Sequence, residues 1–335
     1  MAEPTKTQTS KTTEAAGATC TTELLLYREE IALLWSPRTA APSESDAPDS
    51  ASSTSGAATA DVPTSGPAAA TLVHRPFRAS FMDEPVTSVT PGSDIGRPVD
   101  ILQLYPDEMN IYGDWGNTLT LVRRLEWMGF VPRVHDLHVG GPLPRRADIV
   151  VGGGGQDSGQ AKVYRDLLER QQWVQTMVEI GTPMLLVCGM YQLFGRSFDT
   201  IGGQQLQGIG VLDVHTKGES ERLVGNVVVE SEQFGTIIGF ENHSGQTFLG
   251  DGVQPLGTVR SGHGAGNNGR DGTEGARVAN VVGTYLHGSV LPKNPRLADY
   301  LIGAALANRY GMMRVPEVDD PFVDQARAVA LTRPR

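Results

Sequence analysis

The stretch MLLVCGMYQLFG, residues 184–195, places an apolar run directly before one of the chain's two cysteines. The run at 184–187 is short and wholly apolar, which predicts a buried strand, and the residues after Gly189 suit a helix. A strand, a Cys-Gly pair and a helix in this order are typical of a nucleophile elbow, where the nucleophile stands in a sharp turn beside a helix N-terminus. The alternative is that Cys188 is a small core residue, because free cysteine is among the most buried residue types.

The segments around this stretch alternate between strand-like and helix-like patterns. Apolar runs predict strands at residues 99–106, 130–137 and 147–155. Helical spacing predicts helices at residues 117–130, 162–181 and 189–198. Asn117 suits a helix N-cap, and Gly181 suits the position just past a helix end. This alternation predicts an α/β fold in which helices cover both faces of a mostly parallel sheet.

The half after residue 200 is less regular, with glycine-rich turns and short β-like runs. It ends in a helical pattern from about Asn294 to Tyr310. We therefore expect antiparallel strands that extend the sheet and a helix that closes it.

The chain of 335 residues has an N-terminal third of different composition. Residues 37–70 are almost wholly Ala, Ser, Thr, Pro, Asp and Gly, which predicts disorder because so little apolar surface is available for burial. We predict a disordered tail at 1–97 with a short amphipathic helix near 24–35, a working domain at 98–313 and a C-terminal tail at 314–335.

Charge and cysteine usage restrict the function class. A formal net charge of −10 provides no overall basic surface for nucleic acid. Cys20 and Cys188 lie in unlike contexts, so no structural disulfide is expected, and such low cysteine usage fits a reducing cytosol. We expect no signal peptide and no transmembrane segment.

Three features fall at the carboxyl ends of predicted strands, where parallel sheets bind their ligands. They are Cys188, the four glycines at 152–155 and His287. The glycines can supply amide donors to an oxyanion, and His287 can serve as a base for the thiol. The glycine run is not a P-loop and does not match GxGxxG. Together these features favour a cysteine nucleophile over a core cysteine.

The residues Cys188-Gly-Met-Tyr-Gln192 resemble the class I glutamine amidotransferases, whose nucleophile is followed four residues later by glutamine. The chain is more closely similar to the CobB/CobQ-like group, and within it to the GatD-type glutaminase subunits of lipid II isoglutaminyl synthases. The matching stretches run in the family's order at 111–117, 152–160, 185–195, 208–216, 239–247, 264–276 and 283–301. The resemblance implies a three-layer amidotransferase sheet with the nucleophile at a strand end.

The resemblance also implies roles for residues of the site. Cys188 would attack the side-chain amide of glutamine, and His287 would accept and return the proton. The amides of Gly154 and Gly189 would hold the oxyanion. Arg222 would bind the substrate carboxylate, the alternative being a surface arginine in a polar loop. Gln192 either lines the substrate pocket or only caps the helix start.

Many class I enzymes carry a glutamate two residues after the histidine, but here that residue is Ser289. The site is therefore either a Cys-His dyad or takes a third member from elsewhere. Glu241 and His243 match a Glu-x-His-x-Gly pattern of the CobB/CobQ-like group. They are candidates for residues that contact the catalytic side chains and position them. Asp114 either caps the following helix or contributes to the site.

By this resemblance the chain is the glutaminase subunit of a lipid II isoglutaminyl synthase, with L-glutamine as its substrate. A MurT-like Mur ligase partner would use the ammonia to amidate the D-glutamate α-carboxylate of the peptidoglycan stem peptide. We expect no cofactor and no metal in this chain, with ATP and magnesium in the partner. We expect a cytoplasmic location, with lipid II reached through the partner at the inner face of the membrane.

Three other functions fit the sequence less well. A glutaminase for corrinoid amidation would usually carry a fused P-loop ATPase domain, and this chain has no GxxxxGK[ST] motif. A catalytically silent binding protein of the same fold would have no chemical need for both Cys188 and His287. A cysteine peptidase is disfavoured because the matching stretches are those of amide-nitrogen transfer.

Overall fold

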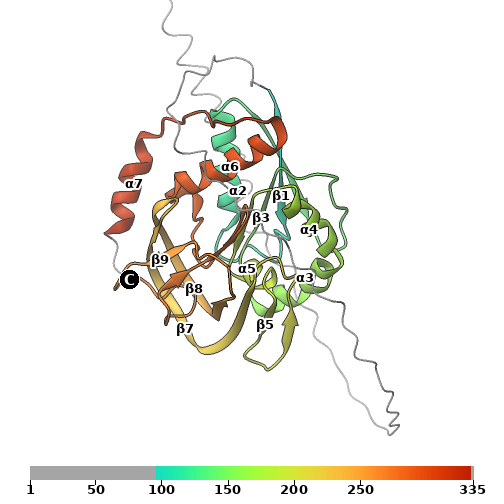
Figure 1. Ribbon diagram of the computed structural model, residues 1–335, viewed down its shortest axis with the longest axis vertical. Coiled ribbons are helices and arrows are strands. Elements are labelled where there is room, and N and C mark those ends of the chain that lie inside the picture. The colour runs from blue at the N-terminus through green and yellow to red at the C-terminus, as the bar shows by residue number, and fades with distance from the viewer. Residues whose placement is uncertain (1–95, 333–335) are drawn as a thin grey trace, which may run out of the picture. The chain divides into compact units, whose positions relative to one another are not determined.

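The computed structural model describes residues 96–332 (Figure 1). The predictions for residues 1–95, including the helix near 24–35, lie outside the described residues. Within 96–332, no helix combines the length and the apolar character that a membrane span requires.

A six-stranded sheet forms the centre of the described domain, in the order β11-β12-β4-β3-β1-β2. Its strands are β1 (Pro98–Leu104), β2 (Val131–Leu137), β3 (Ile149–Gly152), β4 (Met184–Val187), β11 (Ala276–Val278) and β12 (Val281–Thr284). All neighbours pair in parallel except β11, which pairs antiparallel with β12. Every residue of β3, β4 and β12 is buried, as expected for central strands with both faces covered.

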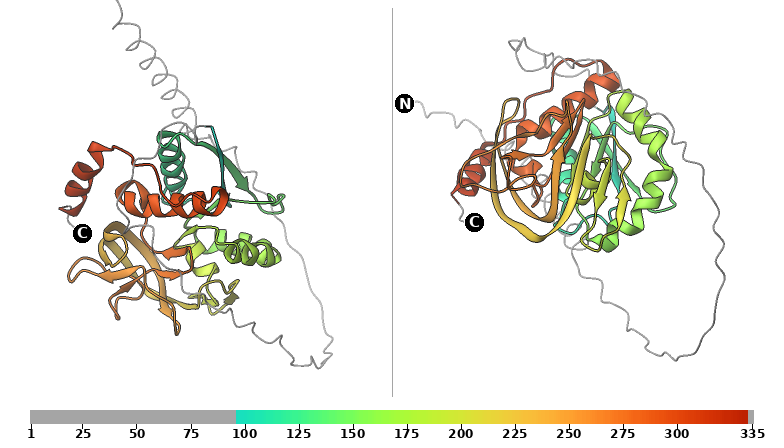
Figure 2. Two further views of the ribbon diagram at one scale, coloured as in Figure 1. Left: turned by 45° about the horizontal axis from the view of Figure 1, so that its top comes forward. Right: turned by 60° about the horizontal axis from the view of Figure 1, so that its bottom comes forward.

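Helices cover both faces of this sheet, which confirms the predicted three-layer α/β fold (Figure 2). On one face α2 (Trp115–Trp127) packs against α6 (Pro295–Tyr310). On the other face lie α3 (Asp157–Glu169) and α4 (Gln171–Glu179). The short α5 (Gly189–Leu193) follows β4 directly.

The second half of the chain departs from the prediction, because its strands form a sheet of their own. Only β11 extends the central sheet in the antiparallel sense. The second sheet contains β5 (Ser197–Asp199), β6 (Gln205–Gln207), β7 (Val214–Ser231), β8 (Gly235–Leu249), β9 (Gly257–Val259) and β10 (Thr273–Glu274). In β8 buried and partly buried residues alternate along much of the strand, a pattern that suits a sheet with one face on the core better than a strand buried on both faces. The long β7–β8 hairpin is the largest element of this sheet (Figure 1).

Several predicted helix boundaries are wrong. Helix α2 begins before Asn117, which is fully buried and accepts a hydrogen bond from the Leu291 N–H at 3.0 Å instead of capping the helix. The predicted helix at 162–181 starts earlier and divides at Arg170 into α3 and α4. Helix α5 is short because the chain turns at Gly195, where a Cβ would stand 2.8 Å from the Val214 side chain.

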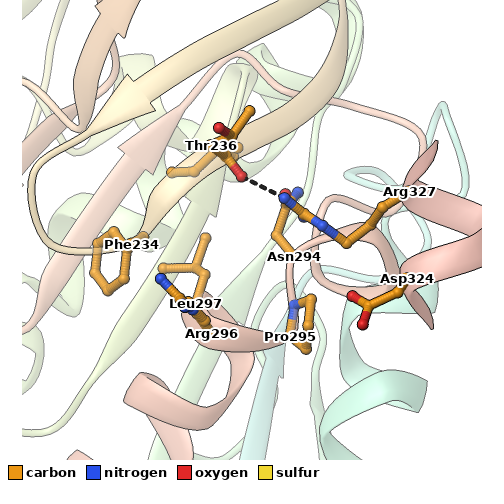
Figure 3. Close-up of a pocket in the computed structure, with 9 residues that line it drawn as sticks. Phe234, Thr236, Asn294, Pro295, Arg296, Leu297, Asp324 and Arg327 are labelled. Carbon is orange, nitrogen blue, oxygen red and sulfur yellow. Dashed lines mark hydrogen bonds between the residues drawn. The ribbon is translucent and has the colours of Figure 1, made fainter. Parts of the chain in front are cut away.

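The C-terminal region contains one helix that the sequence analysis did not predict. Helix α6 ends at Gly311, whose φ of 68° suits a left-handed C-cap, and α7 (Pro321–Leu331) follows. Arg327 of α7 donates to the Thr236 carbonyl at 2.7 Å and to the Asn294 side chain at 3.0 Å (Figure 3). These bonds hold α7 against the start of α6 and the start of β8, beside a pocket of about 280 Å³.

Candidate active site

Cys188 occupies the turn between β4 and α5, as the sequence predicted. Its backbone has φ 50° and ψ −103°, a conformation that non-glycine residues seldom adopt and that costs on the order of 1–3 kcal/mol. The Cys188 N–H donates to the Thr284 carbonyl at 2.8 Å, so the turn is fixed to the end of β12. The thiol is therefore held at the carboxyl edge of the central sheet.

His287 follows β12, the strand that pairs with β4 in the register Thr284 to Val187. The His287 N–H donates to the Phe240 carbonyl at 2.7 Å, and the residue is fully buried. A Cβ built on Gly154 would stand 2.6 Å from Cε1 of His287 and 3.2 Å from Cβ of Cys188. The structure thus brings Cys188 and His287 together around Gly154, where no side chain fits.

Asp114 precedes α2 and is 2% exposed. One oxygen, Oδ2, accepts the Gly154 N–H at 2.7 Å, and the other, Oδ1, lies 3.5 Å from Nδ1 of His287. Ser289 stands where many class I enzymes carry a glutamate, and its Oγ donates to the Gly113 carbonyl at 2.8 Å. The carboxylate next to the His287 imidazole is thus that of Asp114. The Ser289 hydroxyl binds the segment that contains Asp114.

The charges of the site favour an imidazolium. Burial alone would lower the pKa of His287. Electrostatic attraction to Cys188 and to the Asp114 carboxylate outweighs burial and raises this pKa to about 10. At neutral pH the site therefore holds a protonated His287 between two groups that favour its charge.

A pocket of about 470 Å³ opens beside Cys188 and includes Arg222 and Gln192 in its lining. Arg222 of β7 donates from Nε to the Asn242 side chain at 2.6 Å and from Nη2 to the Tyr112 hydroxyl at 3.1 Å. These bonds hold the guanidinium at the pocket, as the sequence analysis anticipated. Gln192 is 4% exposed and lies deeper in the pocket lining.

Glu241 and His243 have separate roles. His243 lines the pocket, its Nδ1 lies 2.6 Å from the Gly245 carbonyl, and its ring stacks on Tyr285 at 3.6 Å. Burial lowers the pKa of His243 to about 4, so it is neutral at neutral pH. Glu241 is fully buried away from the pocket lining, and it accepts backbone N–H groups of the loop at 265–266.

The glycine amides differ from the prediction in one respect. The N–H of Gly154 is engaged by Asp114, so it is not free to bind an oxyanion. A Cβ on Gly189 would stand 3.1 Å from the amide nitrogen of Gly155. The backbone nitrogen of Gly155, not that of Gly154, therefore lies close to Gly189, the residue after Cys188.

Sequence reasoning missed two side chains of this site. The Tyr112 ring meets the His287 ring edge to face, with centroids 4.5 Å apart. Gln160 of α3 lines the pocket and donates to Gln192. Both lie in stretches that match the family, but a tyrosine or glutamine in a loop or helix start has no signature of its own.

Comparison with known proteins gives a consistent family. Residues 100–295 match the CobB/CobQ-like glutamine amidotransferase domain. The GatD subunit of lipid II isoglutaminyl synthase (glutamine-hydrolyzing) from Staphylococcus aureus is 37% identical over 234 residues, which cover 70% of this chain and 95% of that relative. The subunit of the same name from Streptococcus pneumoniae is 34% identical over 226 residues, 66% of this chain and 86% of the relative. A probable cobyric acid synthase from Methanothermobacter thermautotrophicus is 33% identical over 154 residues, only 29% of its own length.

Proposed function

The chain belongs to the CobB/CobQ-like glutamine amidotransferase family, and we propose from this premise that it is the glutaminase subunit of a lipid II isoglutaminyl synthase. It hydrolyses L-glutamine to glutamate and ammonia. The observation that carries the proposal is the convergence of Cys188, His287 and Asp114 on Gly154, at the carboxyl edge of the sheet. The similarity to two GatD subunits along most of their length supports the same activity.

The first half-reaction releases ammonia. The Cys188 thiolate attacks the side-chain amide carbon of glutamine, forming a C–S bond while the carbonyl electrons move to oxygen. The N–H groups of Gly155 and Gly189 hold this oxyanion, and each such donor contributes about 3 kcal/mol to the transition state. Protonated His287 then gives its proton to the amide nitrogen, the C–N bond breaks, and ammonia leaves behind a glutamyl thioester.

The second half-reaction restores the enzyme. His287, now neutral, takes a proton from water, and the resulting hydroxide attacks the thioester carbon. The C–S bond breaks, the thiolate of Cys188 re-forms beside the imidazolium, and glutamate is released. Asp114 keeps the imidazole oriented and favours its charged form throughout both steps.

Arg222 binds the α-carboxylate of the substrate at the pocket. A guanidinium presents paired N–H donors that match a carboxylate, and bonds to Asn242 and Tyr112 fix its orientation. This contact holds the α end of glutamine at Arg222 and leaves its amide end for Cys188.

The ammonia is consumed by a second polypeptide. We propose a MurT-like Mur ligase subunit that binds ATP and magnesium and amidates the D-glutamate α-carboxylate of lipid II. Free ammonia is largely ammonium at neutral pH and a poor nucleophile, which favours a stable complex between the two subunits. The lipid-linked substrate would bring this complex to the inner face of the cytoplasmic membrane. Corrinoid amidation is less well supported, since the cobyric acid synthase match covers only 29% of that relative.

Glutamate release from L-glutamine by the full chain tests the activity. We expect the Cys188→Ala variant to lose release entirely, and the matched Cys20→Ala variant to keep it. The assay is run with and without the MurT-like partner, because the complex of the two subunits is the assembly proposed to act. Release that persists in Cys188→Ala, or no release from the wild-type complex, would contradict the proposal.

A further inference from the structure

Two buried polar atoms of the pocket lining, Oε1 of Gln160 and Nε2 of His243, have no hydrogen-bond partner among residues 96–332. Gln160 is 3% exposed and lies in the lining of the Cys188 pocket. An unpaired buried acceptor costs about 1–3 kcal/mol, so its retention in a pocket points to a ligand that supplies the missing donor.

Hydrogen bonds behind Gln160 engage the nitrogen of its side-chain amide. Nε2 of Gln160 donates to Oε1 of Gln192 at 2.8 Å, and Nε2 of Gln192 donates to the Tyr285 hydroxyl at 3.1 Å. The Tyr285 hydroxyl in turn lies 2.7 Å from the Thr247 hydroxyl. This chain of bonds takes up the nitrogen of Gln160 and leaves the oxygen as the free acceptor.

Gln160 lies beside the nucleophile. A Cβ on Gly189 would stand 2.8 Å from Nε2 of Gln160, so the side-chain amide rests against the backbone of the residue after Cys188. Arg222, the proposed partner of the substrate carboxylate, comes from β7 and is bonded to Tyr112 and Asn242. A glutamine whose amide carbon lies at Cys188 therefore brings its amide group close to Gln160.

We propose that Gln160 is a specificity-determining residue whose Oε1 accepts an N–H from the side-chain amide of the substrate. This inference rests on the proposed glutaminase function. It adds the way in which the site discriminates between glutamine and glutamate. The amide nitrogen carries two N–H donors, whereas the glutamate carboxylate carries none and repels an acceptor. The contact between Gln160 and the amide nitrogen lasts until ammonia leaves. The glutamate product has no such N–H group, which favours its release.

The test measures two affinities in a background that cannot turn over. Full-length Cys188→Ala protein is titrated by calorimetry with L-glutamine and with L-glutamate, with and without Gln160→Met. We expect the ratio of glutamate Kd to glutamine Kd to fall about 10- to 100-fold in the double variant, the effect of one lost discriminating hydrogen bond. Misfolded protein lowers both apparent stoichiometries alike and leaves the ratio unchanged.

Gln156→Met is the matched control. Gln156 lines the same pocket four residues earlier, but its side chain is exposed and makes no helix-capping bond. The Kd ratio is expected to stay within about twofold of the parent in this variant. A ratio that is unchanged in Gln160→Met, or that falls equally in Gln156→Met, overturns the proposal.

Two further results separate this inference from the proposed function. If the Cys188→Ala parent binds no glutamine, alone or with the partner, the glutaminase assignment fails and the inference fails with it. If the parent binds glutamine, a crystal structure of that complex tests the contact without any change at Gln160. The substrate amide nitrogen should lie within about 3.2 Å of Oε1, and a separation beyond hydrogen-bonding range overturns the proposal alone.

Discussion

At the level of single residues, Asp114 links the two halves of the site. Its Oδ2 takes the N–H of Gly154, and its Oδ1 faces the imidazole of His287. Ser289 stands where many class I enzymes carry a glutamate, and its hydroxyl donates to the Gly113 carbonyl. The carboxylate next to His287 therefore comes from the segment before α2 and not from the segment after the histidine.

Asp114→Asn is expected to lower kcat on the order of 100-fold, because the imidazole loses its charged partner. Burial lowers the pKa of His287 while Cys188 and Asp114 raise it, so loss of the carboxylate lowers that pKa. The alkaline limb of the kcat/KM profile, where His287 loses the proton that it must donate, should move to lower pH. In the control, Ser289→Ala, the carboxylate remains and the limb should stay in place. An unmoved limb in Asp114→Asn would show that Asp114 acts only on the backbone.

At the level of elements, the long β7–β8 hairpin builds the binding side of the pocket. Its register shifts between Gly218 and Leu223, and Arg222 lies in this irregular part. Across the pair, Leu223 faces His243 and Val224 faces Asn242, so both strands contribute to the pocket lining. The local break in pairing thus coincides with residues that line the pocket.

Arg222→Lys is expected to raise KM for glutamine about tenfold and leave kcat within about threefold, because the contact acts on substrate and transition state alike. Lysine keeps the charge but loses the paired donors and the bonds to Asn242 and Tyr112. Steady-state kinetics of glutamate release measure both constants. Arg260→Lys, in an exposed pair with Glu230, is the control. A fall in kcat with KM unchanged would place Arg222 in the chemistry instead.

Sequence patterns predicted the elements whose signals are local. The predictions were correct for the strands β1, β3 and β4 and for the glycine after α4. A strand buried on both faces is a run of apolar residues, and a helix often ends at glycine, so both can be recognised in a short stretch of sequence. Asn117 was misread because its partner, the Leu291 N–H, is distant in sequence. The second sheet was missed because the sequence pattern of a strand does not show which sheet the strand joins.

The same distinction applies to the site. Cys188 and His287 were found through strand ends and family motifs, and the structure brings them together. The engagement of the Gly154 amide by Asp114 and the contact of Tyr112 with His287 depend on distances between loops. No spacing within the sequence encodes such distances.

At the level of the whole molecule, an ionic cluster ties α6 to the central sheet. Arg309, near the end of α6, donates to Asp100 of β1 and to Asp148 just before β3. The Asp148 side chain is fully buried, and Arg146 pairs with its other oxygen at 2.9 Å. The last long helix of the domain is thereby fixed to the edge of the sheet opposite the site.

Arg309→Met is expected to lower the free energy of unfolding by about 2–3 kcal/mol, because the buried Asp148 carboxylate loses one of its cationic partners. Burial would raise the pKa of Asp100, but hydrogen bonds from Arg309 and His135 hold it below its ordinary value. The stabilisation is therefore present at neutral pH and lost as pH falls through that lowered pKa. Urea denaturation at neutral and acidic pH measures this, with Arg196→Met, in an exposed pair with Asp213, as control. Equal losses in both variants would contradict a special role for the cluster.

Removal of residues 1–95 is expected to leave kcat/KM for glutamine within about twofold, since every residue assigned to the site lies after residue 110. Glutamate release by the truncated and full chains, each with the partner, makes the comparison. A collapse of activity would show that the N-terminal region belongs to the catalytic domain.

Cys188 and His287 lie at the ends of adjacent strands, yet the chain between them carries the whole second sheet. During translation, Cys188 is therefore incorporated long before His287. The pair meets only when β12 has joined β4 and its Thr284 carbonyl has accepted the Cys188 N–H. A nascent chain thus has no means of consuming cellular glutamine, and onset of hydrolysis reports that synthesis has passed the last strand.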